Sequence, residues 1–186
     1  DYDQSASLPN SVLGTFNTPG EGRCGFTKKF VNSYLMADGT RFTDKPDYDK
    51  IEFVNEVSGR DPRLAQTIRT TKGLNFSNCI TGYQPHKYIV EANLNSSAAS
   101  YNDLPLFRMA EIYLNYAEAK AELGEITQGD LDISVNKIRA RAKMPDLNLG
   151  AANDSPDPYL SSAETGYANV TGANKGVILE IRRERT

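Results

Sequence analysis

The sequence predicts a mainly α-helical fold with one helix pair, long irregular loops and a few short β-strands. Between residues 104 and 145, apolar residues recur at steps of three and four, which is the repeat of an amphipathic helix. The flanking segments are rich in glycine, proline, serine and asparagine, which favour turns and loops. Outside the helix pair, short runs of residues fit strands better than long helices.

The first helix of the pair is predicted from about Leu106 to Gly124. One apolar row contains Leu106, Met109, Ala110, Tyr113, Ala117 and Ala121, and a second contains Ile112, Tyr116, Ala119 and Leu123. A helix with two apolar rows packs between neighbours, so we expect contacts on both sides. Gly124 supplies the left-handed residue that often follows a helix.

The second helix is predicted to begin at Asp130, as its N-cap, and to end before Pro145. Its apolar stripe contains Leu131, Val135, Ile138 and Ala142. Two antiparallel helices joined by a short turn are typical of a tetratricopeptide-type repeat, and about three such repeats are needed for stability. The sequence holds one copy, so we expect the natural chain to be longer and this part of it not to fold stably alone.

The remaining segments are predicted to be short elements and loops. Helices are expected over 26–36 and 177–185, and 51–57 is expected as a short helix or a buried segment. Short strands are expected near 11–15, 40–42, 65–70 and 87–91, and 148–175 as an irregular stretch. The chain is thus one region with three parts. These are a loop-rich segment with short strands (1–103), the helix pair (104–145), and a long loop with a truncated helix (146–186).

Composition and charge exclude several classes of function. A net charge of −3 argues against nucleic-acid binding. His86 is the single histidine, which argues against a histidine-based triad or a multi-histidine metal site, and we expect no cofactor and no bound metal. Two cysteines, Cys24 and Cys79, could form a disulfide or remain as free buried thiols, and the sequence leaves this open.

Two further patterns are weaker than they look. Residues 20–25 fit G-x-G-x-x-G, but Pro19 precedes them instead of a buried strand, so a flexible loop is the better interpretation. Glu118 and Glu122 lie one helical turn apart. A glycosidase needs two carboxyl groups that converge across a cleft, so we expect these two to form ion pairs or face solvent. The sequence therefore predicts no catalytic residue and no enzyme.

Several sequence motifs resemble those of the SusD/RagB family of outer-membrane nutrient-binding lipoproteins from Bacteroidetes. In the helix pair these motifs are residues 106–119 (LFRMAEIYLNYAEA), 122–124 (ELG) and 136–142 (NKIRARA). Outside it they are residues 34–39 (YLMADG), 60–63 (RDPR) and 178–185 (ILEIRRER). Their order is similar to that in the C-terminal half of such proteins, from about residue 27 onward.

The resemblance implies a SusD-like fold and a role in polysaccharide utilization. Such a protein is lipid-anchored at the cell outer membrane, through an anchor that would lie outside this chain. It captures an oligosaccharide or another nutrient and hands it to a SusC-like TonB-dependent transporter. The alternative from the helix pattern is a helical-repeat module for protein–protein interaction without sugar binding. The sequence does not identify the glycan.

A sugar-binding site needs aromatic rings for the C–H face of the sugar and planar polar side chains for its hydroxyls. We expect Tyr34, Tyr113 and Tyr116 to lie in the core, because they fall on predicted helices. The aromatic residues of predicted loops are Tyr2, Phe16, Tyr48, Tyr83, Tyr101, Tyr159 and Tyr167. We predict a ligand-binding site in the N-terminal loop, at Tyr2, Phe16 and Arg23.

Overall fold

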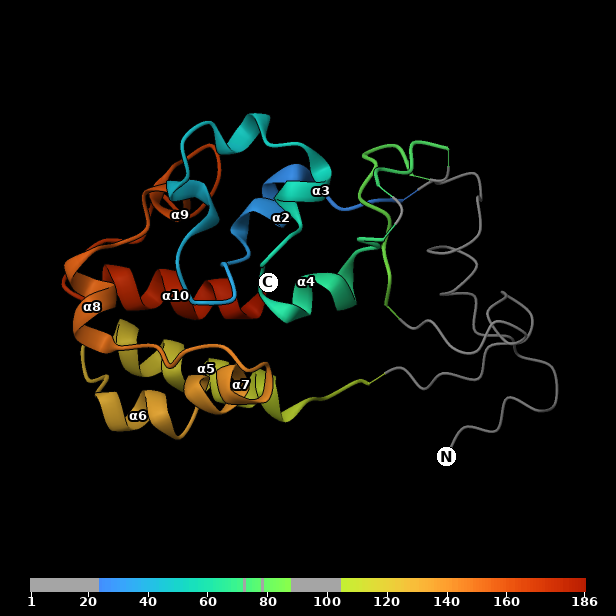
Figure 1. Cartoon of the computed structure of the whole chain (residues 1–186). Helices are drawn as coiled ribbons and strands as arrows, with labels where there is room; N and C mark the ends of the chain where they lie inside the picture. Colours follow the sequence, from blue (N-terminus) through green and yellow to red (C-terminus); the bar gives the residue numbers. More distant parts are fainter. Residues whose placement is uncertain (1–23, 72, 78, 88–104) are drawn as a thin grey trace, which may run out of the picture. The chain divides into compact units, whose positions relative to one another are not determined.

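A computed structural model describes residues 24–71, 73–77, 79–87 and 105–186 (Figure 1). The chain divides into two compact units, one of Asp1–Val31 and Asp47–Pro105 and the other of Asn32–Pro46 and Leu106–Thr186. The chain passes from the first unit to the second within helix α2 (Lys28–Ser33). Helices and loops make up the described residues, which confirms the predicted mainly α-helical class.

The first unit contains three short elements and a partly polar core. These elements are η3 (Tyr48–Lys50), α3 (Phe53–Glu56) and α4 (Pro62–Thr67). Apolar side chains buried in this unit are Val31, Leu64, Ile68, Cys79 and Tyr83. Arg60 is also buried and donates hydrogen bonds of 2.7 Å to the backbone carbonyls of Glu56 and Val31. Arg60, the first residue of the motif 60–63, therefore lies inside the unit and joins two of its segments through these hydrogen bonds.

The short strands predicted for this chain are absent from the described residues. Pairing is limited there to isolated bridges, such as Ile68 with Pro85. The first half of the stretch 65–70, predicted as a strand, belongs to α4, because Asp61 caps that helix and Pro62 occupies its first turn. The stretch 40–42 runs into the 3₁₀ helix η2 (Phe42–Asp44). The strand expected near 11–15 lies outside the described residues, and so does the one expected near 87–91, apart from Lys87.

The second unit is built around helix α10 (Lys175–Arg185), which lies along α5 (Met109–Glu122) and also packs on α8 (Leu149–Asp154) (Figure 1). Both close approaches depend on small residues. Ala117 and Ala121 of α5 are buried, and a Cβ placed on Gly176 of α10 would lie 1.8 Å from the carbonyl oxygen of Ala152 in α8. Burial of Val177, Leu179 and Ile181 stabilises α10.

The helix pair matches the prediction at its first helix and differs at its second. Gly124 follows α5 with a φ of 76°, in the expected left-handed conformation. The second helix is broken into α6 (Gln128–Asp132) and α7 (Val135–Arg141). Asp130 is not the N-cap, because Thr127 caps α6 and Asp130 completes a capping box from the third helical position.

The stretch 148–175 is less irregular than predicted. It contains α8 and the short helix α9 (Pro158–Ser161). Asn148 caps α8 by accepting from the N–H of Ala151, and Asp157 caps α9 by accepting from the N–H groups of Tyr159 and Leu160. These caps start helices that are too short to show an apolar period, so the sequence pattern missed them.

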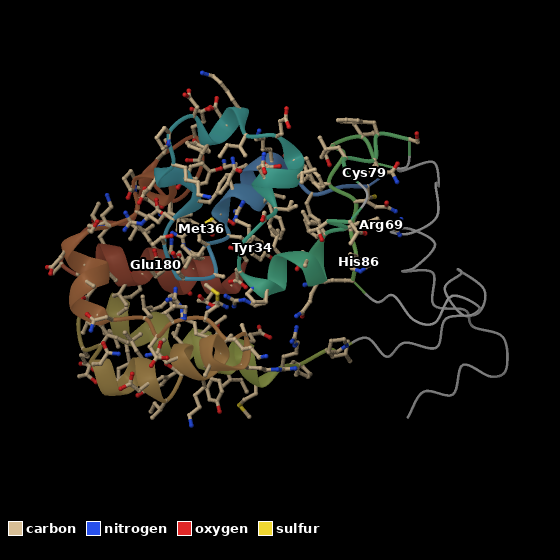
Figure 2. The ribbon with its side chains drawn as sticks, viewed as in Figure 1. Tyr34, Met36, Arg69, Cys79, His86 and Glu180 are labelled. Carbon is tan, nitrogen blue, oxygen red and sulfur yellow. The ribbon has the colours of Figure 1, made fainter. Side chains whose placement is uncertain are left out.

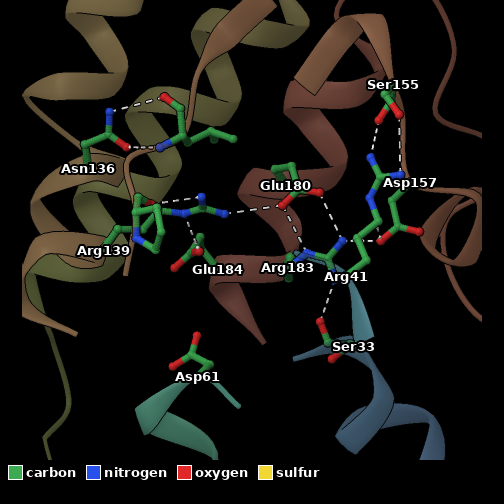
Figure 3. Close-up of polar contacts among 12 residues, drawn as sticks. Ser33, Arg41, Asp61, Asn136, Arg139, Ser155, Asp157, Glu180, Arg183 and Glu184 are labelled. Atoms are coloured by element: carbon green, nitrogen blue, oxygen red, sulfur yellow. Dashed lines mark hydrogen bonds and ion pairs between the residues drawn. The ribbon is translucent and has the colours of Figure 1, made fainter. Parts of the chain in front are cut away.

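A buried network of ion pairs joins α10 to three other parts of the second unit (Figure 3). Arg183 pairs with Asp157 and Glu180 and donates to the backbone carbonyl of Ser33 at 2.6 Å. Arg139 of α7 pairs with Glu184 at 2.8 Å and with Glu180. Every one of these charged groups has a partner of opposite sign, so the network has a structural role.

Candidate functional site

The loop 73–82 of the first unit carries three exposed apolar side chains close together in sequence. Their exposed fractions are 37% for Leu74, 61% for Phe76 and 71% for Ile80. An exposed aromatic ring next to exposed aliphatic groups is costly in water and is typical of a binding surface. This loop is therefore the first candidate for ligand contact within the described part of the chain.

Hydrogen bonds link several of the described residues of this loop. The N–H of Asn75 donates to the carbonyl of Gly82 at 3.0 Å, and the N–H of Cys79 donates to the carbonyl of Asn75 at 3.0 Å. The side-chain amide of Asn75 also donates to Gln84 Oε1 at 3.0 Å. These bonds fix the backbone on both sides of Phe76, so its ring is presented without a large ordering cost.

Gly82 sets the position of the Phe76 ring. The glycine has a φ of 81°, and a Cβ placed on it would lie 2.9 Å from Leu74 Cδ2 and 3.2 Å from Phe76 Cε1. The Leu74 and Phe76 side chains therefore rest on a bare backbone that only glycine provides. One edge of the Phe76 ring packs on the loop, and much of the ring remains in solvent.

Polar side chains lie on the two segments next to this loop, as Figure 2 shows for Arg69 and His86. These segments pair through bonds from the N–H of Arg69 to the carbonyl of Gln84 at 2.9 Å and from the N–H of His86 to the carbonyl of Thr67 at 2.8 Å. Burial, and then the nearby charge of Arg69, lower the pKa of His86 below 6.5. His86 is therefore neutral at pH 7, and its buried Nδ1 has no hydrogen-bond partner among the described residues.

Among the described residues of the first unit, the two carboxylates nearest its core already have hydrogen-bond or ion-pair partners. Glu56 is buried and accepts from the Tyr83 hydroxyl at 3.0 and 3.1 Å, and Asp61 caps α4 while pairing with Arg63 at 2.5 Å. In the second unit, Glu118 pairs with Arg182 at 2.9 Å. The expected ion-pairing role of Glu118 is thus confirmed. Among the described residues, no group of acidic, cysteine or histidine side chains forms a metal site.

A second exposed apolar surface lies on α5. Its residues are Met109, Ile112, Tyr116 and Leu123, which point away from the buried row that contains Leu114, Ala117 and Ala121. Of the first predicted row, Ala117 and Ala121 are buried but Met109 is exposed. The expectation of contacts along both rows is therefore not met within the described residues. Tyr116 was expected in the core, and it is partly exposed with its hydroxyl donating to Asp130.

The structure changes the list of candidate aromatic residues. Tyr2, Phe16 and Arg23, the predicted site, lie outside the described residues. Tyr83 and Tyr159 come from predicted loops but are buried, so they offer no open ring. Phe76 was missed because its segment was interpreted as a polar loop. The available signal was a phenylalanine between two polar residues in a loop bounded by glycines.

The described fold is mainly α-helical, and it is similar to solved structures of SusD-like proteins. A SusD-like carbohydrate-binding protein from Bacteroides fragilis matches with a TM-score of 0.60 and 26% identity, over 86% of this chain and 31% of that chain. A second SusD-like protein from the same species matches with a TM-score of 0.57 and 25% identity, over 96% of this chain and 36% of that chain. This chain therefore spans about a third of each. No curated protein matches.

The sequence matches the SusD family over residues 1–186, and the chain belongs to that family. This confirms the resemblance inferred from the helix pair and from the sequence motifs on either side of it. In the described residues, no helix has both the length and the apolar character needed to cross a membrane.

Proposed function

We propose that this protein binds a glycan on the loop 73–82 and that Phe76 is the platform for one sugar ring. The observation that carries the proposal is an aromatic side chain, 61% exposed, on a loop held by its own hydrogen bonds. The apolar C–H face of a sugar packs on such a ring. Arg69, on an adjoining segment and partly exposed, carries a guanidinium that can donate hydrogen bonds to hydroxyls.

Family membership supports a carbohydrate ligand for this chain. One SusD-like protein of known structure carries carbohydrate binding in its description. Binding without catalysis is the simplest role for the loop, because the buried carboxylates Glu56 and Asp61 are already engaged by other groups. A glycosidase mechanism needs two carboxyl groups facing the same bond.

The test is affinity electrophoresis of the purified protein through gels that contain a panel of neutral soluble polysaccharides. Phe76→Ala is expected to weaken binding about 10-fold or more, because an exposed aromatic anchor carries a large share of binding energy. The matched control is Phe107→Ala, since Phe107 is 90% exposed and belongs to the other unit. Equal retardation of Phe76→Ala and the unmodified protein would refute the assignment.

The predicted N-terminal site remains a proposal, and a combined variant distinguishes it from the loop. If Tyr2, Phe16 and Arg23 bind the ligand, replacing all three by alanine abolishes retardation while Phe76→Ala leaves it intact. If both sets contribute, each variant weakens binding. The same gels therefore locate the site.

We also propose that the bound oligosaccharide passes to a SusC-like TonB-dependent transporter and that the protein is lipid-anchored at the outer membrane. Under this proposal the chain is the C-terminal part of a longer SusD-like protein. Family membership and the one-third coverage of the solved structures support this placement. Chemical cross-linking in intact outer membranes, followed by mass spectrometry, tests it, and failure to recover a transporter peptide would count against it.

The exposed α5 surface favours an alternative, a helical-repeat module that binds an apolar helix. Ile112 and Leu123 are 58% and 72% exposed on one face of α5. Such a stripe is typical of helix-in-groove recognition. The double variant Ile112→Ser, Leu123→Ser would abolish peptide binding and spare polysaccharide binding, whereas Phe76→Ala would do the reverse.

A further inference from the structure

The two cysteines of the sequence lie on neighbouring segments of the first unit. Both are free thiols in the structure; Cys24 is exposed and Cys79 is buried. Cys79 belongs to the loop 73–82 (Figure 2), and its Sγ lies 3.3 Å from the hydroxyl of Thr81. Fifty-five positions separate the two cysteines in sequence, so their proximity is a product of the fold.

Gly25 brings the N-terminal segment directly against Cys79. A Cβ placed on Gly25 would lie 2.0 Å from Cys79 Sγ and 2.3 Å from Thr81 Oγ1, which no side chain could tolerate. The segment is held there by a 3.1 Å bond from the N–H of Phe26 to the carbonyl of Tyr83. Glycine at position 25 is therefore required for this approach.

The approach of Gly25 places Cys24 within reach of the buried sulfur. Since consecutive Cα atoms are about 3.8 Å apart, the Cα of Cys24 lies within about 7 Å of Cys79 Sγ. The Cα atoms of a disulfide are commonly about 5.5 Å apart, and each Cα lies closer still to the partner's Sγ, so joining the sulfurs requires Cys24 to rotate and its backbone to move towards Cys79.

We propose that Cys24 and Cys79 form an intrachain disulfide when the protein is oxidised. A small disulfide such as oxidised glutathione, or a dithiol oxidase, is the oxidant. The Cys24 thiolate attacks one sulfur of glutathione disulfide, which forms a mixed disulfide and releases one glutathione thiolate. The Cys79 thiolate then attacks Cys24 Sγ, and the second glutathione leaves. The two protein thiols lose two electrons and two protons, and two glutathione molecules gain them.

The difference in exposure sets the order of these steps. Cys24 is open to solvent and meets the oxidant, whereas Cys79 is shielded from solvent and reacts second, with Cys24. The product ties the N-terminal segment to the loop that carries Phe76. The proposal rests on the packing of Gly25 and not on glycan binding, so either can fail without the other.

The test is disulfide mapping of the protein, in the length in which it is naturally made, before and after incubation with oxidised glutathione. Trypsin separates the cysteines into peptides 24–28 and 73–87. Oxidation is expected to yield one species that combines both peptides and that disappears with dithiothreitol. The Tm is expected to rise by about 5 °C or more on oxidation, because the cross-link restricts the unfolded chain.

Two variants complete the design. Cys79→Ala removes the resolving thiol, so a glutathione adduct is expected to accumulate on Cys24. Cys24→Ser changes an exposed side chain, and Cys79 is then expected to stay reduced. A persistent glutathione adduct on Cys24 of the unmodified protein, or recovery of both cysteines as free thiols after oxidation, would overturn the proposal.

Discussion

Arg183 donates to the carboxylate of Asp157, which lies 26 residues earlier in the chain, and both side chains are buried. Asp157 also forms an ion pair with Arg41, in which Oδ2 lies 3.8 Å from Arg41 Nε, and it caps α9. One carboxylate thus fixes α10, η2 and α9 in a single place within the second unit.

Asp157→Asn is expected to destabilise the protein by about 3–5 kcal/mol, because it leaves buried positive charge undercompensated. Asparagine keeps the side-chain oxygen that caps α9, so the loss reports on charge. The measurement is urea denaturation. Glu125→Gln is the control, since Glu125 pairs with Lys120 at 3.8 Å on the surface, and its loss is expected to cost at most about 1 kcal/mol. Equal effects of the two variants would contradict the prediction.

Tyr83→Phe is expected to cost about 1–3 kcal/mol, because it removes a hydrogen bond to the buried Glu56 carboxylate. Burial, and then the charge of Glu56, raise the pKa of Tyr83 above 10. The hydroxyl therefore contributes stability below pH 10 that is lost as the pH rises through the higher folded-state pKa. Unfolding free energies of the two proteins, measured from pH 7 to 11, should differ by a constant amount up to about pH 10 and begin to approach each other above it.

The control for Tyr83→Phe is Tyr113→Phe, which alters a half-buried tyrosine of α5. Its effect is expected to stay within about 0.5 kcal/mol. If the two variants lose the same stability at pH 7, the bond to Glu56 is not what stabilises the first unit.

Thr127→Val is expected to raise the pKa of Asp130. The Thr127 hydroxyl, followed by the Tyr116 hydroxyl, lowers that pKa from 3.8 to about 2. Because the folded-state pKa is depressed, the capping box stabilises the fold above pH 3.8 and loses this effect as the pH falls towards 2. Carboxyl NMR titration measures the shift, and Thr171→Val, an exposed threonine of the same unit, should leave the Asp130 titration unchanged.

Gly176→Ala is expected to destabilise the second unit by about 3 kcal/mol, since the new methyl group would overlap the carbonyl of Ala152. The matched control is Gly150→Ala in α8, where the nearest atom, Asn148 Oδ1, is 3.5 Å away. That variant is expected to be neutral or to stabilise by up to about 1 kcal/mol, because alanine favours helices. Chemical denaturation of both variants would show the contrast, and similar midpoints would argue against tight packing of α10 on α8.

Long-period features of this fold could be predicted from the sequence. The apolar residues of α5 repeat over about four turns, and Gly124 follows the helix. Both the helix and its C-terminal end could therefore be predicted. Helix α10 was found as well, although its stability comes from burial and not from its own length. The burial pattern of α10 matches its pattern of apolar residues, whereas α5 leaves Ile112 and Leu123 exposed.

Features that depend on single side chains could not be predicted in this way. The break between α6 and α7 follows from the capping box of Thr127 and a non-helical Ser134. In the candidate site, Phe76 looked like any loop phenylalanine. Its exposure depends on hydrogen bonds from Asn75 and on the space above Gly82, which involve the path of the whole loop.

The second unit consists of two segments that are far apart in sequence, Asn32–Pro46 and Leu106–Thr186. The ribosome therefore makes its two parts at different times. Arg183 leaves the ribosome 150 residues after Ser33, whose carbonyl it will bind. At about 5–20 residues per second, that delay is roughly 10–30 s. Leu35 and Phe42, which lie on the same early segment, are buried in the folded protein. The bond between Arg183 and the carbonyl of Ser33 can therefore form only after nearly the whole chain has been made.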